Sequence, residues 1–249
     1  MNKSLRRLGN MDIFFHKSSV EDDSASIVNL LSLGTEHQRV KKYICEYFDL
    51  PEEELAKKNK ADLEKVIARV VQSEQIKSAE IIDGKIENID TLWKSEKQKI
   101  NRILCNVFEC QESDLLLTAF LSVNCVCPYD FKKKRIYINY RKSCHEMLET
   151  CVHELIHYCW FNKWYTLFQD KYEENVVWTF SEIVIDTLFS ETELERYCVS
   201  EYPAHKHFYD VTYKGQNMME YFRRLYRDNS ISEFMRLGIE TVRDLENIL

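Results

Sequence analysis

The sequence predicts a helix-rich α+β fold with a small mixed or antiparallel sheet. Only 5 of its 249 residues are glycine and 3 are proline, which favours long helices over a turn-rich β fold. Most of the chain repeats apolar residues at helical spacing, whereas two segments between residues 115 and 141 have the patterns of strands. A chain of this length with 45% hydrophobic residues can bury one large core or two small ones.

Charge and cysteine usage narrow the class of protein. The net charge of −7 argues against a general binder of nucleic acid or of anionic membranes, because such proteins are basic. The basic N-terminus lacks the apolar core of a signal peptide, and no apolar stretch reaches transmembrane length, so we expect a cytoplasmic protein. The 9 cysteines, including the pair Cys125 and Cys127, fit reduced thiols that pack as small hydrophobes.

Residues 1–85 are predicted to form a helical N-terminal region. A first helix covers Asp23 to Leu33, and a capping box of Thr35 and Gln38 starts the second. Two more follow, one opened by Pro51 and one over residues 63–71. This region carries no recognisable chemistry, and a role in partner binding or in gating a substrate stays open.

The segment around Gly84 is predicted to separate this region from a second domain, residues 86–249. An amphipathic helix follows from Leu92 to Phe108. Strands are then predicted over residues 115–127 and 135–141, joined by a turn at Pro128.

The segment from Ser143 to Trp160 is predicted to be a buried helix that carries a metal clamp. Ser143 and Glu146 form a capping box, and no glycine or proline interrupts the apolar stripe that follows. His153 and His157 stand four residues apart, so a helix places both imidazoles on one face. A catalytic zinc ion usually takes three protein ligands and a water, so a third ligand must come from elsewhere in the chain.

A second predicted helix, Val176 to Phe189, supplies the candidate. Glu182 and Asp186 are its only charged residues, and they share one face because they stand four residues apart. Burying two carboxylates on such an apolar helix is costly unless each meets a cation or a hydrogen-bond donor.

The pattern His-Glu-x-x-His followed by Glu-x-x-x-Asp resembles the gluzincin metallopeptidases, the thermolysin-like group of zincins. The resemblance covers about Ile136 to Phe189 and implies a zincin-like catalytic domain within residues 86–249. The loop before Glu182 is longer than in thermolysin, and Ser181 replaces the asparagine that often precedes that glutamate.

Carried over residue by residue, the resemblance implies roles for five side chains. His153, His157 and Glu182 would hold one zinc ion per chain, and Glu154 would be the general base. Asp186 would accept a hydrogen bond from the second ring nitrogen of His153. Because zinc is inferred from the type of ligand, manganese or cobalt could also occupy the site.

Two further segments are candidates for contact with substrate. In zincins an edge strand pairs with the extended peptide, and we expect Arg135 to Tyr140 to do so, with an ordinary half-buried strand as the alternative. Gluzincins often place a histidine or tyrosine opposite the zinc to stabilise the oxyanion. His207 and Tyr209 are the candidates here, with a plain surface loop as the alternative. Two amphipathic helices complete the chain.

The leading hypothesis is therefore zinc-dependent hydrolysis of a peptide bond in a peptide or protein substrate, without a nucleic-acid or membrane partner. A second hypothesis is a non-catalytic zincin-like metal-binding scaffold or regulatory interaction module. A third is an accidental motif in a helical protein with a satisfied pair of core histidines, against which the paired Glu182 and Asp186 argue.

Overall fold

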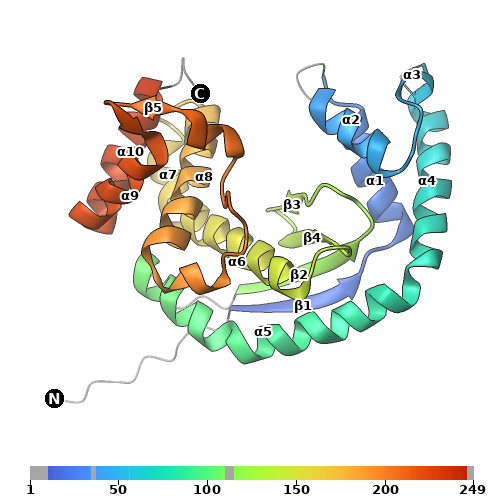
Figure 1. The fold of residues 1–249 in the computed structure, drawn as a ribbon, viewed down its shortest axis with the longest axis horizontal. Coiled ribbons are helices and arrows are strands. Elements are labelled where there is room, and N and C mark those ends of the chain that lie inside the picture. The colour runs from blue at the N-terminus through green and yellow to red at the C-terminus, as the bar shows by residue number, and fades with distance from the viewer. Residues whose placement is uncertain (1–10, 35–37, 56, 110–114, 246–249) are drawn as a thin grey trace. The chain divides into compact units, whose positions relative to one another are not determined.

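The computed structural model describes residues 11–34, 38–55, 57–109 and 115–245. Its fold is helix-rich α+β, which confirms the predicted class (Figure 1). The chain divides into two compact units, each discontinuous in sequence. Unit 1 comprises Met1–Asp12, Ser95–Leu115 and Leu148–Leu249, and unit 2 comprises Ile13–Lys94 and Leu116–Met147.

The main sheet has four strands in the order β1-β2-β4-β3 and is mixed, as predicted. β2 and β4 pair in parallel, from Thr118 opposite Arg135 to Ser122 opposite Asn139. β3 pairs with β4 in the antiparallel sense. The strands are β1 (Met11–Lys17), β2 (Leu115–Ser122), β3 (Tyr129–Asp130) and β4 (Arg135–Asn139).

β4 is not an edge strand, so the prediction that Arg135–Tyr140 pairs with a substrate is wrong. β2 occupies one of its sides, and on the other Tyr129 pairs with Ile136 while the N–H of Tyr137 donates to the Pro128 carbonyl at 3.1 Å. A strand whose backbone groups are already used cannot add a peptide. The segment predicted only as a turn at Pro128 folds back along β4 and covers it.

β1 is a strand that the sequence analysis did not predict. Its burial alternates, with Met11, Ile13 and Phe15 buried and His16 exposed. The signal is obscured because Phe14 is 48% exposed, so an apolar residue occupies an outward position. The predicted helical region of residues 1–85 therefore contains one strand of the sheet.

The helices of unit 2 follow the predicted pattern closely. α1 and α4 pack against each other, and each begins at a side-chain cap: Ser19 accepts from the N–H of Asp22, and Asn59 from that of Asp62. Thr35, half of a predicted capping box, lies outside the described residues. The helices are α1 (Val20–Leu31), α2 (Gln38–Tyr47), α3 (Glu52–Leu55) and α4 (Lys60–Lys77).

The helix α5 runs without interruption over Ala79–Phe108 and includes Gly84. Glycine in a helix interior costs about 1 kcal/mol relative to alanine, but a long stripe of fully buried residues outweighs this here. Ile82, Ile89, Trp93 and Ile100 belong to that stripe. Gly84 therefore does not end a helix, and the division into residues 1–85 and 86–249 stays a prediction.

Unit 1 is built around the buried helix α8, which packs against η3, α9 and α10. A two-stranded antiparallel ribbon, β5 with β6, precedes α9. The elements are α6 (Cys144–Trp160), the π-helix η2 (Phe161–Tyr165), α7 (Thr166–Phe168), α8 (Glu174–Glu191), the 3₁₀-helices η3 (Glu193–Tyr197) and η4 (Lys206–Asp210), β5 (Thr212–Tyr213), β6 (Gln216–Asn217), α9 (Met218–Asp228) and α10 (Ile231–Leu245).

α6 begins as the sequence predicts. The N–H of Ser143 donates to Glu146 Oε2 at 2.7 Å, and the N–H of Glu146 donates to Ser143 Oγ at 3.3 Å, which confirms the capping box. α6 then continues into η2 instead of ending in the predicted loop. The later 3₁₀-helix η3 is capped by Thr192, which accepts from the N–H of Leu194.

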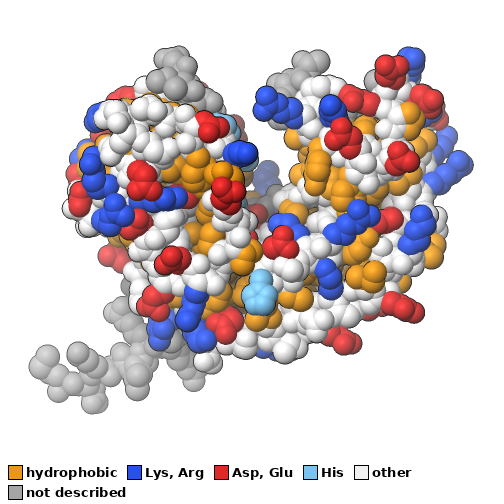
Figure 2. Space-filling view, in the orientation of Figure 1, with side chains coloured by type: hydrophobic (Ala, Val, Ile, Leu, Met, Phe, Trp, Pro, Cys, Tyr) orange, Lys and Arg blue, Asp and Glu red, His pale blue; other side chains and the backbone are white. Residues whose placement is uncertain are grey.

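Charged side chains of both signs alternate with hydrophobic ones over the face in Figure 2. Within the described part of the chain, no helix combines the length and the apolar character that a membrane span requires.

Candidate metal centre

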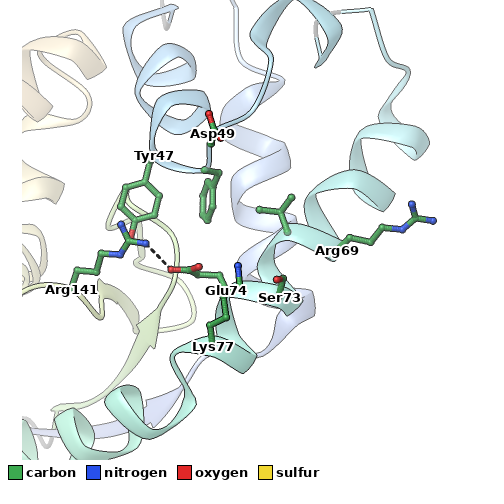
Figure 3. Close-up of a pocket in the computed structure, with 9 residues that line it drawn as sticks. Tyr47, Asp49, Arg69, Ser73, Glu74, Lys77 and Arg141 are labelled. Carbon is green, nitrogen blue, oxygen red and sulfur yellow. Dashed lines mark hydrogen bonds and ion pairs between the residues drawn. The ribbon is translucent and has the colours of Figure 1, made fainter.

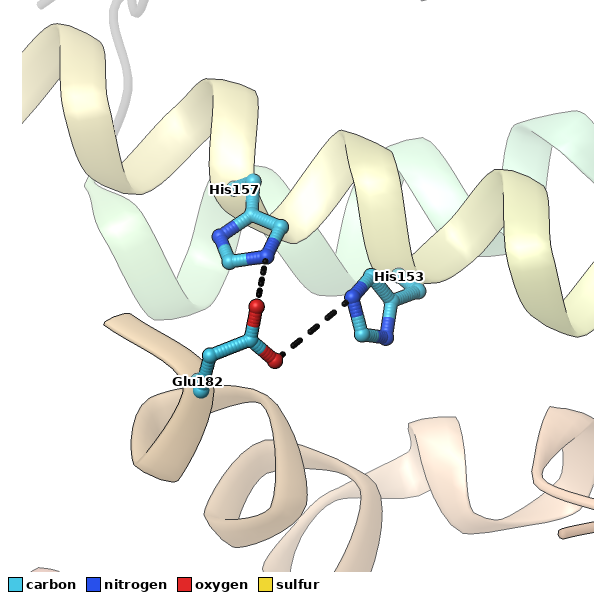
Figure 4. A group of neighbouring side chains, drawn as sticks. All are labelled: His153, His157 and Glu182. Atoms are coloured by element: carbon cyan, nitrogen blue, oxygen red, sulfur yellow. Dashed lines mark hydrogen bonds and ion pairs between the residues drawn. The ribbon is translucent and has the colours of Figure 1, made fainter. Parts of the chain in front are cut away.

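Three side chains of unit 1 point toward one another (Figure 4). His153 and His157 come from α6, and Glu182 comes from α8. Glu182 Oε1 lies 3.2 Å from His157 Nε2, and Glu182 Oε2 lies 3.9 Å from His153 Nε2. One ligand atom from each residue lies within 4.8 Å of the others, so the described residues include a group that can hold a metal ion.

The two helices hold these side chains by burying their other faces. On α6, Val152, Leu155 and Ile156 are fully buried, which fixes the rotation of the helix and aims both histidines the same way. The two imidazole rings lie 4.9 Å apart, centre to centre. α8 is buried on almost every side, so Glu182 is only 5% exposed.

The donor set fits a divalent metal ion. In a tetrahedral zinc site with bonds of roughly 2.0–2.1 Å, neighbouring ligand atoms lie roughly 3.3–3.4 Å apart. The observed separations of 3.2 and 3.9 Å, which run from the two imidazoles to different oxygens of Glu182, are near this value. Two imidazole nitrogens and one carboxylate oxygen are also the donors that zinc prefers at catalytic sites.

His157 is packed like a core residue although it is polar. It is 2% exposed, and its Nδ1 has no hydrogen-bond partner among the described residues. The indole of Trp178 stacks on the imidazole at 5.3 Å. Leaving a buried ring nitrogen unsatisfied costs about 1–3 kcal/mol, so packing alone does not account for a histidine here. The other ring nitrogen, Nε2, faces Glu182 Oε1 at 3.2 Å and is the atom that could bind a metal ion.

The charge of Glu182 is stabilised by its neighbours. Burial by itself raises the pKa of this carboxyl, but the hydrogen bond with His157 and the charges of His157, His153 and His205 together lower the pKa below its ordinary value. Glu182 is therefore an ionised carboxylate at neutral pH, which is the form that binds a metal ion.

Glu154, the predicted general base, follows His153 on α6 and is 7% exposed. Its position in the helix and its burial agree with the predicted role, which stays a prediction. The π-helix η2 begins four residues after His157, and the ring of its first residue, Phe161, lies 5.9 Å from that imidazole. π-Helical turns occur frequently at functional sites.

Asp186 is fully buried one turn after Glu182, and its carboxylate is held by two neighbours. Arg223 donates to Oδ2 through Nε at 2.9 Å and to Oδ1 through Nη2 at 2.8 Å. Tyr209 donates its hydroxyl to Oδ1 at 2.6 Å. The sequence analysis missed Arg223, and the predicted bond between Asp186 and His153 stays a prediction.

Of the segment proposed to stabilise an oxyanion, His205 is the residue beside the metal centre. Its Nε2 lies 3.9 Å from Glu182 Oε1, and its side chain is 57% exposed. Tyr209 has a single O–H, which it donates to Asp186. The predicted candidate His207 is exposed and contacts the rings of His205 and Phe208.

Comparison with protein-family models, curated proteins and solved structures finds no match to this chain. The function is therefore inferred from the geometry of its own residues.

Proposed function

We propose that this chain is a zinc-dependent peptide hydrolase, with a zincin-like arrangement of α6 and α8 in unit 1. The observation that carries the proposal is the convergence of His153, His157 and Glu182, whose ligand atoms lie within 4.8 Å of one another. Glu154 follows the first of these ligands directly, as a general base beside a metal ion does.

The residues of the chain divide the chemistry between them. When bound, zinc acts as a Lewis acid and makes water a nucleophile at neutral pH. Glu154 accepts the proton released from the attacking water and later donates it to the leaving amine. Its burial keeps this proton away from bulk solvent. The substrate is a peptide or protein in the cytoplasm, and β4 takes no part in pairing with it.

His205 is proposed to stabilise the oxyanion in place of His207 or Tyr209. It is an exposed imidazole that lies 3.9 Å from a ligand carboxylate, so it can donate to an oxygen that gains charge near the ion. Tyr209 instead holds Asp186 in position through its hydroxyl.

Metal content of the purified protein is the first test. We expect about one zinc ion per chain in the wild type, as for a three-ligand catalytic site, and loss of that ion in His157→Ala and Glu182→Gln. His145→Ala is the matched control, because His145 is an exposed histidine on the same helix outside the ligand group. It should keep its zinc. A wild type that binds no zinc when supplied with it would exclude the proposed centre.

Hydrolysis is tested separately with Glu154→Gln, which keeps the shape of the side chain and removes the base. We expect full zinc content and at least a ~100-fold lower rate of cleavage of a peptide library, since a positioned base contributes about 10²–10⁴-fold. An unchanged rate would refute Glu154 as the base. Zinc binding without any hydrolysis by the wild type would leave the metal-binding scaffold as the function.

A further inference from the structure

Unit 2 contains a pocket of its own, built from residues that the metal centre does not use. Its volume is about 420 Å³, within the range of sites for small molecules. The end of α2 forms one wall, one face of α4 forms another, and Arg141 closes a third (Figure 3). The lining combines cationic, acidic and aromatic side chains: Tyr47, Phe48, Asp49, Arg69, Val70, Ser73, Glu74, Lys77 and Arg141.

Arg141 is held in a fixed position at this pocket. Its Nη2 donates to Glu74 Oε1 at 2.6 Å and its Nε donates to the hydroxyl of Tyr140 at 3.2 Å. Its guanidinium carbon lies 4.4 Å from the ring centre of Tyr47, which is a cation–π contact. A guanidinium has five N–H donors, so three of them remain for a ligand after these two bonds.

The negative charge of Glu74, in turn, is stabilised by its neighbours. Its Oε1 accepts from Tyr140 at 2.7 Å as well as from Arg141. Burial raises the pKa of Glu74, but these two hydrogen bonds and the charges of Arg141 and Lys77 together lower it. The ionised carboxylate is thus committed to Arg141 and Tyr140 and does not dominate the charge of the pocket.

Three other polar side chains of the lining make no hydrogen bond. Within the described part of the chain, the structure gives no hydrogen bond or ion pair within 4.0 Å to the side chains of Asp49, Ser73 and Lys77, although the charge of Lys77 helps to stabilise that of Glu74. Ser73 and Lys77 stand four residues apart on one face of α4, whereas the guanidinium of Arg69 points away from Arg141 and Glu74 (Figure 3). The pocket therefore offers cationic side chains, an acidic group and two apolar lining residues, Phe48 and Val70.

We propose that this pocket binds a small zwitterion with an apolar side chain, that is, an amino acid or a short peptide. The carboxylate of the ligand would meet Arg141, Lys77 and Ser73, its ammonium group would meet Asp49, and its side chain would cover Phe48. A phosphate or another simple anion would leave Asp49 facing a like charge, whereas a zwitterion uses both signs. The inference does not depend on the metal centre.

Calorimetric titration of the full chain at low salt tests this proposal with three probes: phenylalanine and two analogues that each lack one of its charged groups. L-Phenylalanine carries both charges, 3-phenylpropionate lacks the ammonium group, and phenethylamine lacks the carboxylate. We expect saturable binding of phenylalanine and at least about tenfold weaker binding of the other two, because a hydrogen bond to a charged group is worth a factor of this size.

Variants then assign each charge to a residue. Asp49→Asn should weaken phenylalanine about tenfold without weakening 3-phenylpropionate, because this anion loses only a repelling charge. Lys77→Gln should weaken phenylalanine about tenfold without weakening phenethylamine, for the same reason. Asparagine suits position 49, whose φ of 52° is left-handed. Lys65→Gln, an exposed lysine of α4 outside the pocket, is the matched control.

Three results would overturn the proposal. The first is no saturable binding of phenylalanine, the second is equal affinity for the three probes, and the third is the same loss in Lys65→Gln as in Lys77→Gln. The last of these would mean that only the overall charge of the protein matters.

Discussion

Three buried carboxylates, Asp23 in unit 2 and Asp186 and Glu182 in unit 1, have different partners. In unit 2, Asp23 is fully buried and accepts from three uncharged donors: the hydroxyl of Ser122 at 2.6 Å, the amide of Gln75 at 2.9 Å and the N–H of Val123 at 3.2 Å. In unit 1, Asp186 is equally buried but meets a guanidinium, and Glu182 meets imidazoles.

The partners determine what each carboxylate can do. Burial raises the pKa of Asp23, and the neutral donors around it only partly offset that effect. Asp23 therefore links α1, α4 and the end of β2 by hydrogen bonds, while its ionised form is disfavoured. Asp186 has a permanent cation beside it and is a structural ion pair. Glu182 faces two imidazoles, and the three side chains form a group that can hold a metal ion.

Breaking the ion pair of Asp186 should have the largest effect on stability. Arg223→Met leaves the carboxylate buried without its cation, and we expect a loss of about 3–5 kcal/mol in the free energy of unfolding, measured by urea titration. Arg227→Met is the matched control one turn later on α9. Arg227 pairs with Glu191 at 2.6 Å but is 50% exposed, so the expected loss is within about 1 kcal/mol.

A double variant separates the pair from its surroundings. Replacing both partners, Asp186→Leu with Arg223→Met, should cost less than the two single changes added together, because no uncompensated charge remains. Additive losses would show that Asp186 and Arg223 contribute independently. Asp186 would then not differ from Asp23 in depending on a charged partner.

Packing around α8 is the next point of comparison with unit 2. A Cβ at Gly238 of α10 would overlap the ring of Phe180 of α8, so Gly238→Ala requires that ring or the helices to shift. We expect a destabilisation of about 1–3 kcal/mol. At Gly84 of α5 nothing lies within 4 Å of an added Cβ, so Gly84→Ala should stabilise by about 0.5–1 kcal/mol through helix propensity. Thermal unfolding of both variants measures whether each change raises or lowers stability. A stabilising Gly238→Ala would refute the close contact.

The sequence predicted the parts of the site that depend on local spacing. His153 and His157 share a face because α6 is a helix, and its start follows from the capping box of Ser143 and Glu146. Glu182 was found because an ionisable residue on an apolar helix needs a partner. The inferences about α6 use residues a few positions apart, where the geometry of a helix is fixed, whereas the pairing of Glu182 with the two histidines came from the resemblance to gluzincins.

The features that were missed depend on contacts between distant segments. Nothing in the spacing of Arg223 indicates that it reaches Asp186, and His205 and His207 are equivalent by sequence until the fold of η4 brings one of them to Glu182. The pairing of β3 along the edge of β4 was missed for the same reason. Pairing between strands depends on the whole sheet, and the alternation of side chains in one strand does not predict it.

The smallest expected effects concern pH, and they have opposite signs at two carboxylates of unit 2. The pKa of Asp23 is raised on folding, so the folded state keeps a proton that the unfolded chain has released. The free energy of unfolding that this group contributes is therefore fully present below about pH 3.9 and falls as the pH rises toward the folded pKa. The pKa of Glu74 is lowered, so its contribution is present above about pH 4.3 and is lost as the pH falls through the folded pKa.

Urea titrations of the wild type, Asp23→Asn and Glu74→Gln at a series of pH values measure both effects. The stability of the wild type relative to Asp23→Asn should decrease as the pH rises from about 4, because the variant has no proton to lose at this site. Relative to Glu74→Gln it should instead increase with pH up to about 4.3 and then stay level. Slopes of the same sign would mean that the neutral donors around Asp23 stabilise its charge as well as Arg141 stabilises that of Glu74. The partner of a carboxylate would then not decide the direction of its pKa shift.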